Sequence, residues 1–111
     1  NPLIIQIYST PVPEKYFPAM NEVFKSDESV KSFMNQSYPY PINELLNYKV
    51  ITSKNKKFIE VQLISHDIQK QIAWWTFHKG NMINISCTSK IEKYNSVSRF
   101  FRKFKDSLSI N

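Results

Sequence analysis

The residues most capable of chemistry in this sequence are one cysteine, Cys87, and two histidines, His66 and His78. A thiol nucleophile needs a base within hydrogen-bond reach. Cys87 and His78 fall in the two strands of a predicted hairpin, where Cys87 pairs near residues 73–74, four or five positions from His78. At about 3.3 Å per residue this is a separation of roughly 13 to 17 Å. His66 lies in a different turn, so we interpret Cys87 as a small buried hydrophobe rather than a nucleophile.

The sequence also gives no support for a metal site or for acid–base catalysis. The only neighbouring histidine and acid are His66 and Asp67, and adjacent residues of an extended chain point apart. Gly80 is the single glycine, whereas phosphate-binding loops and nucleophile elbows need two or three. The nine acids are scattered and mostly adjoin lysines, which argues against a catalytic carboxylate pair. The sequence therefore predicts no enzyme, no metal site and no cofactor.

The basic character of the chain indicates the class of partner. Fifteen Lys and Arg stand against nine acids, giving a net charge of +6, which favours nucleic acid, an anionic membrane or an acidic protein face. Aromatic residues interleaved with lysines stack bases when they are exposed. The aromatic candidates are Tyr38, Tyr40 and Trp74, and the lysines are Lys54, Lys56 and Lys57. No motif of a known nucleic-acid module accompanies them. Surface lysine is also an ordinary means of staying soluble.

Length and composition bound the architecture. At 111 residues, 41% hydrophobic and 14% aromatic, the chain predicts one packed domain over residues 1–111. One cysteine allows no internal disulfide, and no run approaches the ~20 apolar residues of a membrane helix. The chain opens on Asn1-Pro2 without an initiator Met, so we expect a trimmed or processed form of a longer protein.

Residues 1–57 predict one strand, two helices and a second strand. Residues 3–8 form a β-rich run, and residues 14–36 keep helical spacing of apolar side chains. Ser26 followed by two acids interrupts the helical pattern and is typical of a new N-cap. The proline-rich residues 38–41 make a rigid connector. A turn of helix is expected at residues 42–46, before a strand at 48–52.

The second half predicts strands at residues 58–65, 71–78 and 82–89. In residues 58–65 apolar and polar side chains alternate, as in a half-buried strand. The last two strands form a hairpin across Lys79-Gly80-Asn81. A three-residue loop places Trp75 and Phe77 on one face with Ile85, and turns Trp74 outward. A two-residue loop reverses this assignment, and the sequence leaves both open.

A basic amphipathic helix at residues 95–110 closes the chain. Its apolar positions form one stripe, its start can be capped by Asn95 or Ser96, and cationic residues occupy the remaining faces. The stripe is predicted to cover a sheet face, leaving only the cations free for contacts. The fold class predicted is thus α+β, a curved antiparallel sheet flanked by helices and closed by this helix. The stripe consists of Val97, Phe100, Phe101, Phe104 and Leu108, and the cations are Arg99, Arg102, Lys103 and Lys105.

The order of these segments carries a family resemblance. An alternating strand (58–64), an aromatic strand (72–78), a Lys-Gly-Asn turn, a strand ending in small hydroxyl residues (83–89) and the closing helix follow one another over about the last 60 residues. This arrangement resembles the family that unites the PsbP subunit of photosystem II, the Ran-binding Mog proteins and bacterial DcrB-like lipoproteins. The resemblance implies helices on both faces of the sheet, no shared catalytic residues, and a role as an accessory subunit or protein binder.

The function expected is therefore a non-enzymatic protein-binding or accessory domain, as in an exported bacterial lipoprotein, with an extracytoplasmic or membrane-anchored location. The alternative is a binder of an anionic surface, nucleic acid or membrane, through the basic helix. The candidate partner contacts are Trp74, His78, Arg99, Arg102 and Lys103. The helix cations are candidates because burial of the apolar stripe points them toward solvent. Trp74 is a candidate if the hairpin has the three-residue loop, which turns it outward.

Overall fold

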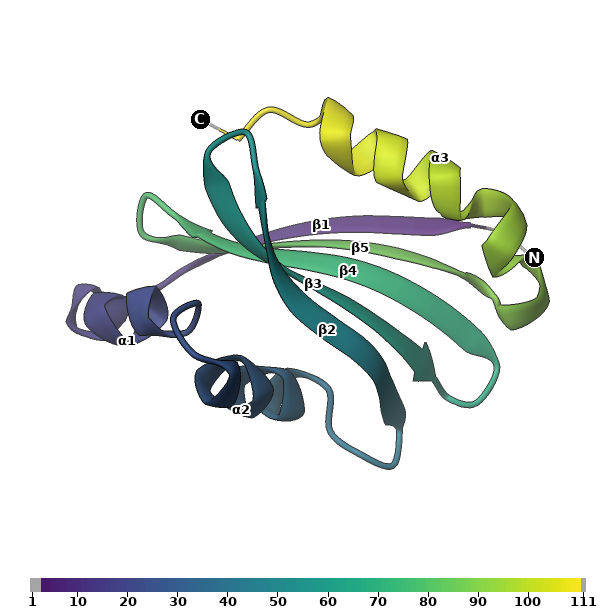
Figure 1. Cartoon of the computed structure of the whole chain (residues 1–111), viewed down its shortest axis with the longest axis horizontal. Coiled ribbons are helices and arrows are strands. Elements are labelled where there is room, and N and C mark those ends of the chain that lie inside the picture. The colour runs from purple at the N-terminus through teal and green to yellow at the C-terminus, as the bar shows by residue number, and fades with distance from the viewer. Residues whose placement is uncertain (1–2, 111) are drawn as a thin grey trace.

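One antiparallel sheet of five strands, in the order β1-β5-β4-β3-β2, forms the centre of the computed structural model, which describes residues 3–110 (Figure 1). Asn1 and Pro2, which suggested a trimmed start, lie outside the described residues. The α+β class, the antiparallel sheet and the closing helix are confirmed. The strands are β1 (Ile4–Pro11), β2 (Asn43–Ser53), β3 (Lys56–Ser65), β4 (Gln69–His78) and β5 (Asn81–Lys90). The helices are α1 (Phe17–Glu22), α2 (Asp27–Ser37) and α3 (Tyr94–Ser107).

Each face of the sheet carries its own apolar core, because helices lie on both sides of it (Figure 1). On one face α2 contributes Val30 and Met34, which are buried against β3 and β4. Ser26 caps this helix by accepting a hydrogen bond from the Ser29 amide, as predicted. On the other face α3 contributes Tyr94 and Phe101, which pack with buried residues of β3, β4 and β5. The covering of both faces, which the family resemblance implied, is confirmed.

The β4–β5 hairpin has the two-residue loop, so the three-residue loop and its outward Trp74 are wrong. His78 pairs with Asn81 across Lys79-Gly80, and both loop residues have positive φ (49° and 80°). Two consecutive positive φ angles are typical of the type I′ turn, whose twist matches that of the strands. Trp74 consequently pairs with Ile85 beneath α3 and is 1% exposed. The loop is one residue shorter than the three-residue loop. Relative to β5, every side chain of β4 therefore lies on the face opposite to the one that the longer loop predicts.

The same register carries Trp75 to the opposite core. There its ring packs edge-on against Phe33, 5.2 Å between centroids, and its indole N–H donates to the Tyr38 hydroxyl at 2.9 Å. Burial raises the pKa of Tyr38 to about 12. Tyr38 is therefore a structural hydrogen-bond acceptor for Trp75, and Tyr38 and Trp74 are withdrawn from any base-stacking role.

The helical turn expected at residues 42–46 is wrong, because this segment is the first part of β2. Leu45 pairs with Leu63 of β3 and packs against the α2-side core. A register shift between Leu45 and Asn47 marks a bulge in this edge strand. Pairing with β3 and burial of Leu45 outweigh the local preference, as is common for strands.

The last helix also differs from its prediction at both ends. It begins at Tyr94 behind a 3₁₀ turn (Ile91–Lys93), so Asn95 and Ser96 are inside the helix and do not cap it. It ends at Ser107, and Leu108 has an extended backbone (φ −76°, ψ 140°) yet still packs on the α3-side core. Of the predicted stripe Phe101 is 0% exposed, whereas Phe100 is 52% exposed and was wrongly placed in the core.

Replacing Gly80 by alanine should lower the free energy of unfolding by about 1–2 kcal/mol, because an L-residue is strained at φ +80°. A Cβ at this position would also lie 3.0 Å from Cζ of Phe17. Lys79→Gly is the matched control and should change stability by less than about 1 kcal/mol. Urea unfolding measures both, and equal effects would contradict the left-handed geometry assigned to Gly80.

The neighbouring phenylalanines of α3 should behave oppositely. Phe101→Ala should lower the free energy of unfolding by about 3–5 kcal/mol, because it leaves a cavity in the α3-side core. Phe100→Ala should cost about 0.5 kcal/mol or less, since that side chain is largely in solvent. Similar losses for the two variants in thermal or urea unfolding would mean that α3 is rotated from its described position.

Candidate binding site

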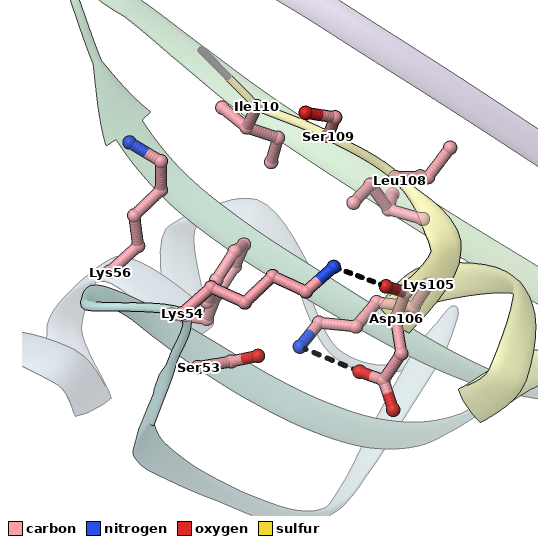
Figure 2. A pocket seen from close by; sticks show the side chains of 10 residues that line it. Ser53, Lys54, Lys56, Lys105, Asp106, Leu108, Ser109 and Ile110 are labelled. Atoms are coloured by element: carbon pink, nitrogen blue, oxygen red, sulfur yellow. Dashed lines mark hydrogen bonds and ion pairs between the residues drawn. The ribbon is translucent and has the colours of Figure 1, made fainter.

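A small hollow lies between the β2–β3 turn and the C-terminal end of α3 (Figure 2). It encloses about 170 Å³. Its residues come from two distant parts of the chain and divide into an apolar group and a cationic group. The apolar members are Phe58, Ile85, Leu108 and Ile110, and the charged members are Lys54, Lys56, Lys105 and Asp106, with Ser53 and Ser109 completing the lining.

The β2–β3 turn brings its lysines to α3. Lys54 and Asn55 both have positive φ (52° and 65°), which makes a tight two-residue turn between paired Ser53 and Lys56. The ammonium of Lys54 donates to the backbone carbonyl of Asp106 in the last turn of α3 (Figure 2). A cation is favoured there, because the last carbonyls of a helix are unpaired and carry partial negative charge.

Lys105, predicted to be free for contacts, is instead buried at 6% exposure. Its ammonium lies 4.5 Å from the ring centroid of Phe58 and 5.9 Å from that of Trp74, and 3.4 Å from Oδ1 of Asp106. Contacts with aromatic faces compensate part of the lost hydration of a cation. Lys105 is thus a fixed positive charge at the wall of the hollow, which corrects its assignment to the free surface.

A buried carboxylate joins the same face of the sheet to α3. Glu60 of β3 is 4% exposed, and its Oε1 accepts from the Trp74 indole and from Arg102, both at 2.9 Å. Lys49 of β2 approaches Oε2 at 3.9 Å. A buried carboxylate needs such partners, because desolvation without them is costly. Arg102 is therefore engaged in holding α3 to the sheet, although part of its side chain remains exposed.

The predicted contact residues have different places in this arrangement. Trp74 is wrong as an outward contact, because it lies beneath α3. Arg99 and Lys103 are exposed on the outer side of α3. His78 is half-buried at the end of β4, and its Nδ1 lies 3.0 Å from the ammonium of Lys56 at the hollow. The structure thus brings the His78 side chain, through Lys56, to the same end of the molecule as the last turn of α3.

The contact with Lys56 indicates which tautomer the neutral form of His78 adopts. An ammonium can only donate, so Nδ1 accepts from Lys56 and Nε2 carries the proton in neutral His78. That Nε2 atom is buried and has no hydrogen-bond partner among the described residues. His78 also lines a second hollow, which shares Ile85, Leu108, Ser109 and Ile110 with the first.

The geometry gives Cys87 no activated thiol. The side chain is buried, it pairs with Ile72, and desolvation raises the pKa of the thiol to about 11. In residues 3–110 no three side chains of His, Cys, Asp or Glu gather to hold a metal ion. Within the same residues, no helix is long and apolar enough to cross a bilayer.

Comparisons with known proteins identify the architecture. No family model matches the chain, and no curated protein matches it by sequence. Solved structures match it in three dimensions, and two of them show the architecture. The cyanobacterial PsbP protein CyanoP from Synechocystis sp. PCC 6803 superposes with a TM-score of 0.64 at 13% identity, covering 96% of this chain and 66% of CyanoP. This chain has a PsbP-like fold.

The second match supports the fold and adds no activity. PA94 from Pseudomonas aeruginosa, a protein of unknown function described as a candidate regulator, superposes with a TM-score of 0.67 at 8% identity, covering 100% of this chain and 85% of PA94. At such identities the likeness concerns the PsbP-like fold alone. The chain spans just under two thirds of CyanoP. Kinship with the Mog and DcrB-like proteins stays a prediction.

Sequence reasoning missed the hollow itself. It left residues 53–57 between two predicted strands and named Lys105 as a helix cation, and it had no means of bringing them together across about 50 residues of sequence. A local signal for the turn exists in Lys54-Asn55 between two alternating strands. A local signal for the inward position of Lys105 also exists, because Lys105 follows Phe101 by four residues and therefore lies on the same side of the helix.

Cys87 should react with iodoacetamide about a hundredfold more slowly in the folded protein than in the unfolded one at pH 8, because only the thiolate reacts. The raised pKa also means that the folded state keeps the proton longer. Its contribution to stability is complete below the ordinary thiol pKa and is lost as the pH rises toward 11. Mass spectrometry of alkylation, with Cys87→Ser as the blank, measures the rate. Fast labelling of the folded protein would show that the thiol is reactive and would contradict its raised pKa.

Proposed function

We propose that this chain is a non-enzymatic accessory domain that binds an acidic segment of another protein at its basic end. The observation that carries the proposal is the hollow, where three lysine ammoniums and one carboxylate surround an apolar floor. Such a combination favours a ligand that is anionic and partly apolar. A protein segment supplies both properties, and the apolar floor distinguishes this surface from a uniformly solvated cationic patch.

The outer side of α3 extends this basic end. Arg99 and Lys103 are exposed and form no ion pair with other residues of the range 3–110. They are one turn apart, so they present two cations on one side of the helix. Charges of this kind steer an acidic partner toward the site and set its orientation.

The accessory role and the location draw on the family resemblance. The PsbP-like fold supports the comparison with CyanoP, which is a PsbP protein. Export, lipid anchoring and a bacterial source rest on the resemblance alone and belong to the proposal at that level. The same holds for the absence of catalysis, which is consistent with the buried, protonated Cys87 thiol.

Charge reversal on α3 tests the proposal. An acidic peptide of alternating glutamate and leucine, fluorescently labelled and blocked at both ends, should bind the protein, and Arg99→Glu/Lys103→Glu should weaken binding at least tenfold. The loss is expected because the reversed charges repel the peptide. Fluorescence anisotropy measures the affinity, and circular dichroism checks that the variant is folded.

The matched control is Lys15→Glu/Lys31→Glu, which makes the same change of net charge. Lys15 precedes α1 and Lys31 is on α2, and both are exposed. This control should keep its affinity within about twofold. If both double variants weaken binding equally, the attraction is general and the protein-binding site on this end is rejected.

A second candidate function has one observation in its favour. Phe100 is exposed on α3 between the cations Arg99 and Lys103, a combination that suits the interface of an anionic membrane. Binding to phosphates weakens steeply as salt rises. Vesicles containing phosphatidylserine and a 20-base-pair DNA duplex, titrated from 50 to 200 mM salt, separate the two functions. Tight, salt-sensitive binding to either, with none to the peptide, would favour the anionic-surface function.

A further inference from the structure

We infer that the hollow receives the carboxy-terminal residue of the partner, with its apolar side chain on the floor and its terminal carboxylate among the lysines. This inference rests on the proposed function and names what the basic end recognises. It uses three features of the described residues: the size of the hollow, the distribution of charge and apolar surface in it, and the fixed position of one of its cations.

The size of the hollow corresponds to one side chain. Its volume is about 170 Å³, whereas pockets for drug-sized ligands are typically about 300–1,000 Å³. An apolar cavity of about 150 Å³ holds one benzene molecule. The volume of the hollow therefore matches a single leucine-sized or phenylalanine-sized group.

The charges around it exceed what the site itself neutralises. Lys54 donates to the backbone carbonyl of Asp106, and Lys105 approaches the Asp106 carboxylate (Figure 2). Lys56 contacts the ring atom Nδ1 of His78. Three ammoniums against one carboxylate leave a local charge of +2. Each ammonium has three N–H donors, so donors remain for a further anionic acceptor after these contacts.

One of the three cations is not an ordinary surface lysine. Lys105 is buried to more than nine-tenths and held against the Phe58 and Trp74 rings. A cation kept in place by packing loses little conformational freedom when it binds, which favours recognition over general attraction. Its charge acts beside an apolar wall, where the attraction to an anion is stronger than in open water.

A chain terminus satisfies this site better than an internal segment does. When the last residue of a protein is apolar, its side chain and the terminal carboxylate are attached to the same Cα atom, so both can enter one small hollow together. An internal segment needs two residues for the same pair of groups, and adjacent side chains of an extended strand point to opposite sides. Capture of terminal carboxylates is a recurring mode of peptide recognition.

The test is a titration of isotope-labelled protein with a hexapeptide of serine and glycine that ends in leucine, followed by two-dimensional amide NMR. The free-acid peptide should shift the amide signals of the β2–β3 turn and of the last turn of α3. The same peptide with an amidated end should bind at least tenfold more weakly, because it lacks the anion.

Lysine variants show where the free-acid peptide binds. Lys54→Met/Lys56→Met should weaken the free-acid peptide at least tenfold. The matched control is Lys31→Met/Lys57→Met, which removes the same charge; Lys31 lies on α2, and Lys57 is adjacent to Lys56 and points to the other face of the sheet. This control should retain its affinity.

The remaining outcomes overturn the inference. Equal binding of acid and amide peptides, no binding of either, or equal loss in both double variants would each reject a terminal-carboxylate site. If 4-methylpentanoate alone binds as tightly as the peptide, the hollow takes a small organic acid and not a protein terminus. None of these results affects the proposed function, which is tested with a peptide whose ends are blocked.

Discussion

The pairing of β4 with β5 is the constraint on which the rest of the structure depends. Lys79 and Gly80 form a two-residue turn with positive φ at both positions, and this turn sets His78 opposite Asn81. Because side chains alternate along a strand, that single pairing sends Trp74 to the α3 side and Trp75 to the α2 side. The two indoles therefore pack in two separate cores, one under each helix layer.

The α3-side core has an electrostatic component that the α2-side core lacks. Glu60 accepts hydrogen bonds from Trp74 and Arg102, and Lys105 lies over the rings of Phe58 and Trp74. Apolar packing alone would let a helix slide or rotate on its sheet. Directional contacts to a buried carboxylate restrict it to one position, a role for which buried polar groups are retained in several proteins. The consequence is that Lys105 is buried and Arg102, although partly exposed, is paired with Glu60.

The positions of Arg102 and Lys105 determine which helix cations are free to contact a partner. Arg99 and Lys103 remain on the outer side of α3, and Lys105 becomes a wall of the hollow together with Lys54 and Lys56. Three of the 15 Lys and Arg residues thereby gather where a turn meets the end of a helix, next to apolar side chains. A PsbP-like sheet shared with CyanoP and PA94 supplies the scaffold, and the chemistry of this end belongs to the residues of the chain itself.

Local patterns determined which segments are helices and strands. The alternation in residues 58–65, the spacing from Val97 to Phe104, and Ser26 before two acids are short-range signals that act through backbone geometry and capping. They predicted the α+β class, the antiparallel hairpins and the closing helix. They also predicted that α3 buries one side, because its stripe is aromatic.

Only the tertiary structure decided which members of those patterns are buried and which residues meet. Phe100 and Phe101 are neighbours of the same type, and the docking angle of α3 alone buries the second and exposes the first. Lys54 lies about 50 residues before Asp106, and the sheet brings its ammonium to the Asp106 carbonyl, next to Lys105. Sequence spacing describes one element at a time, whereas a site between elements depends on register and docking, which are set by packing across the whole sheet.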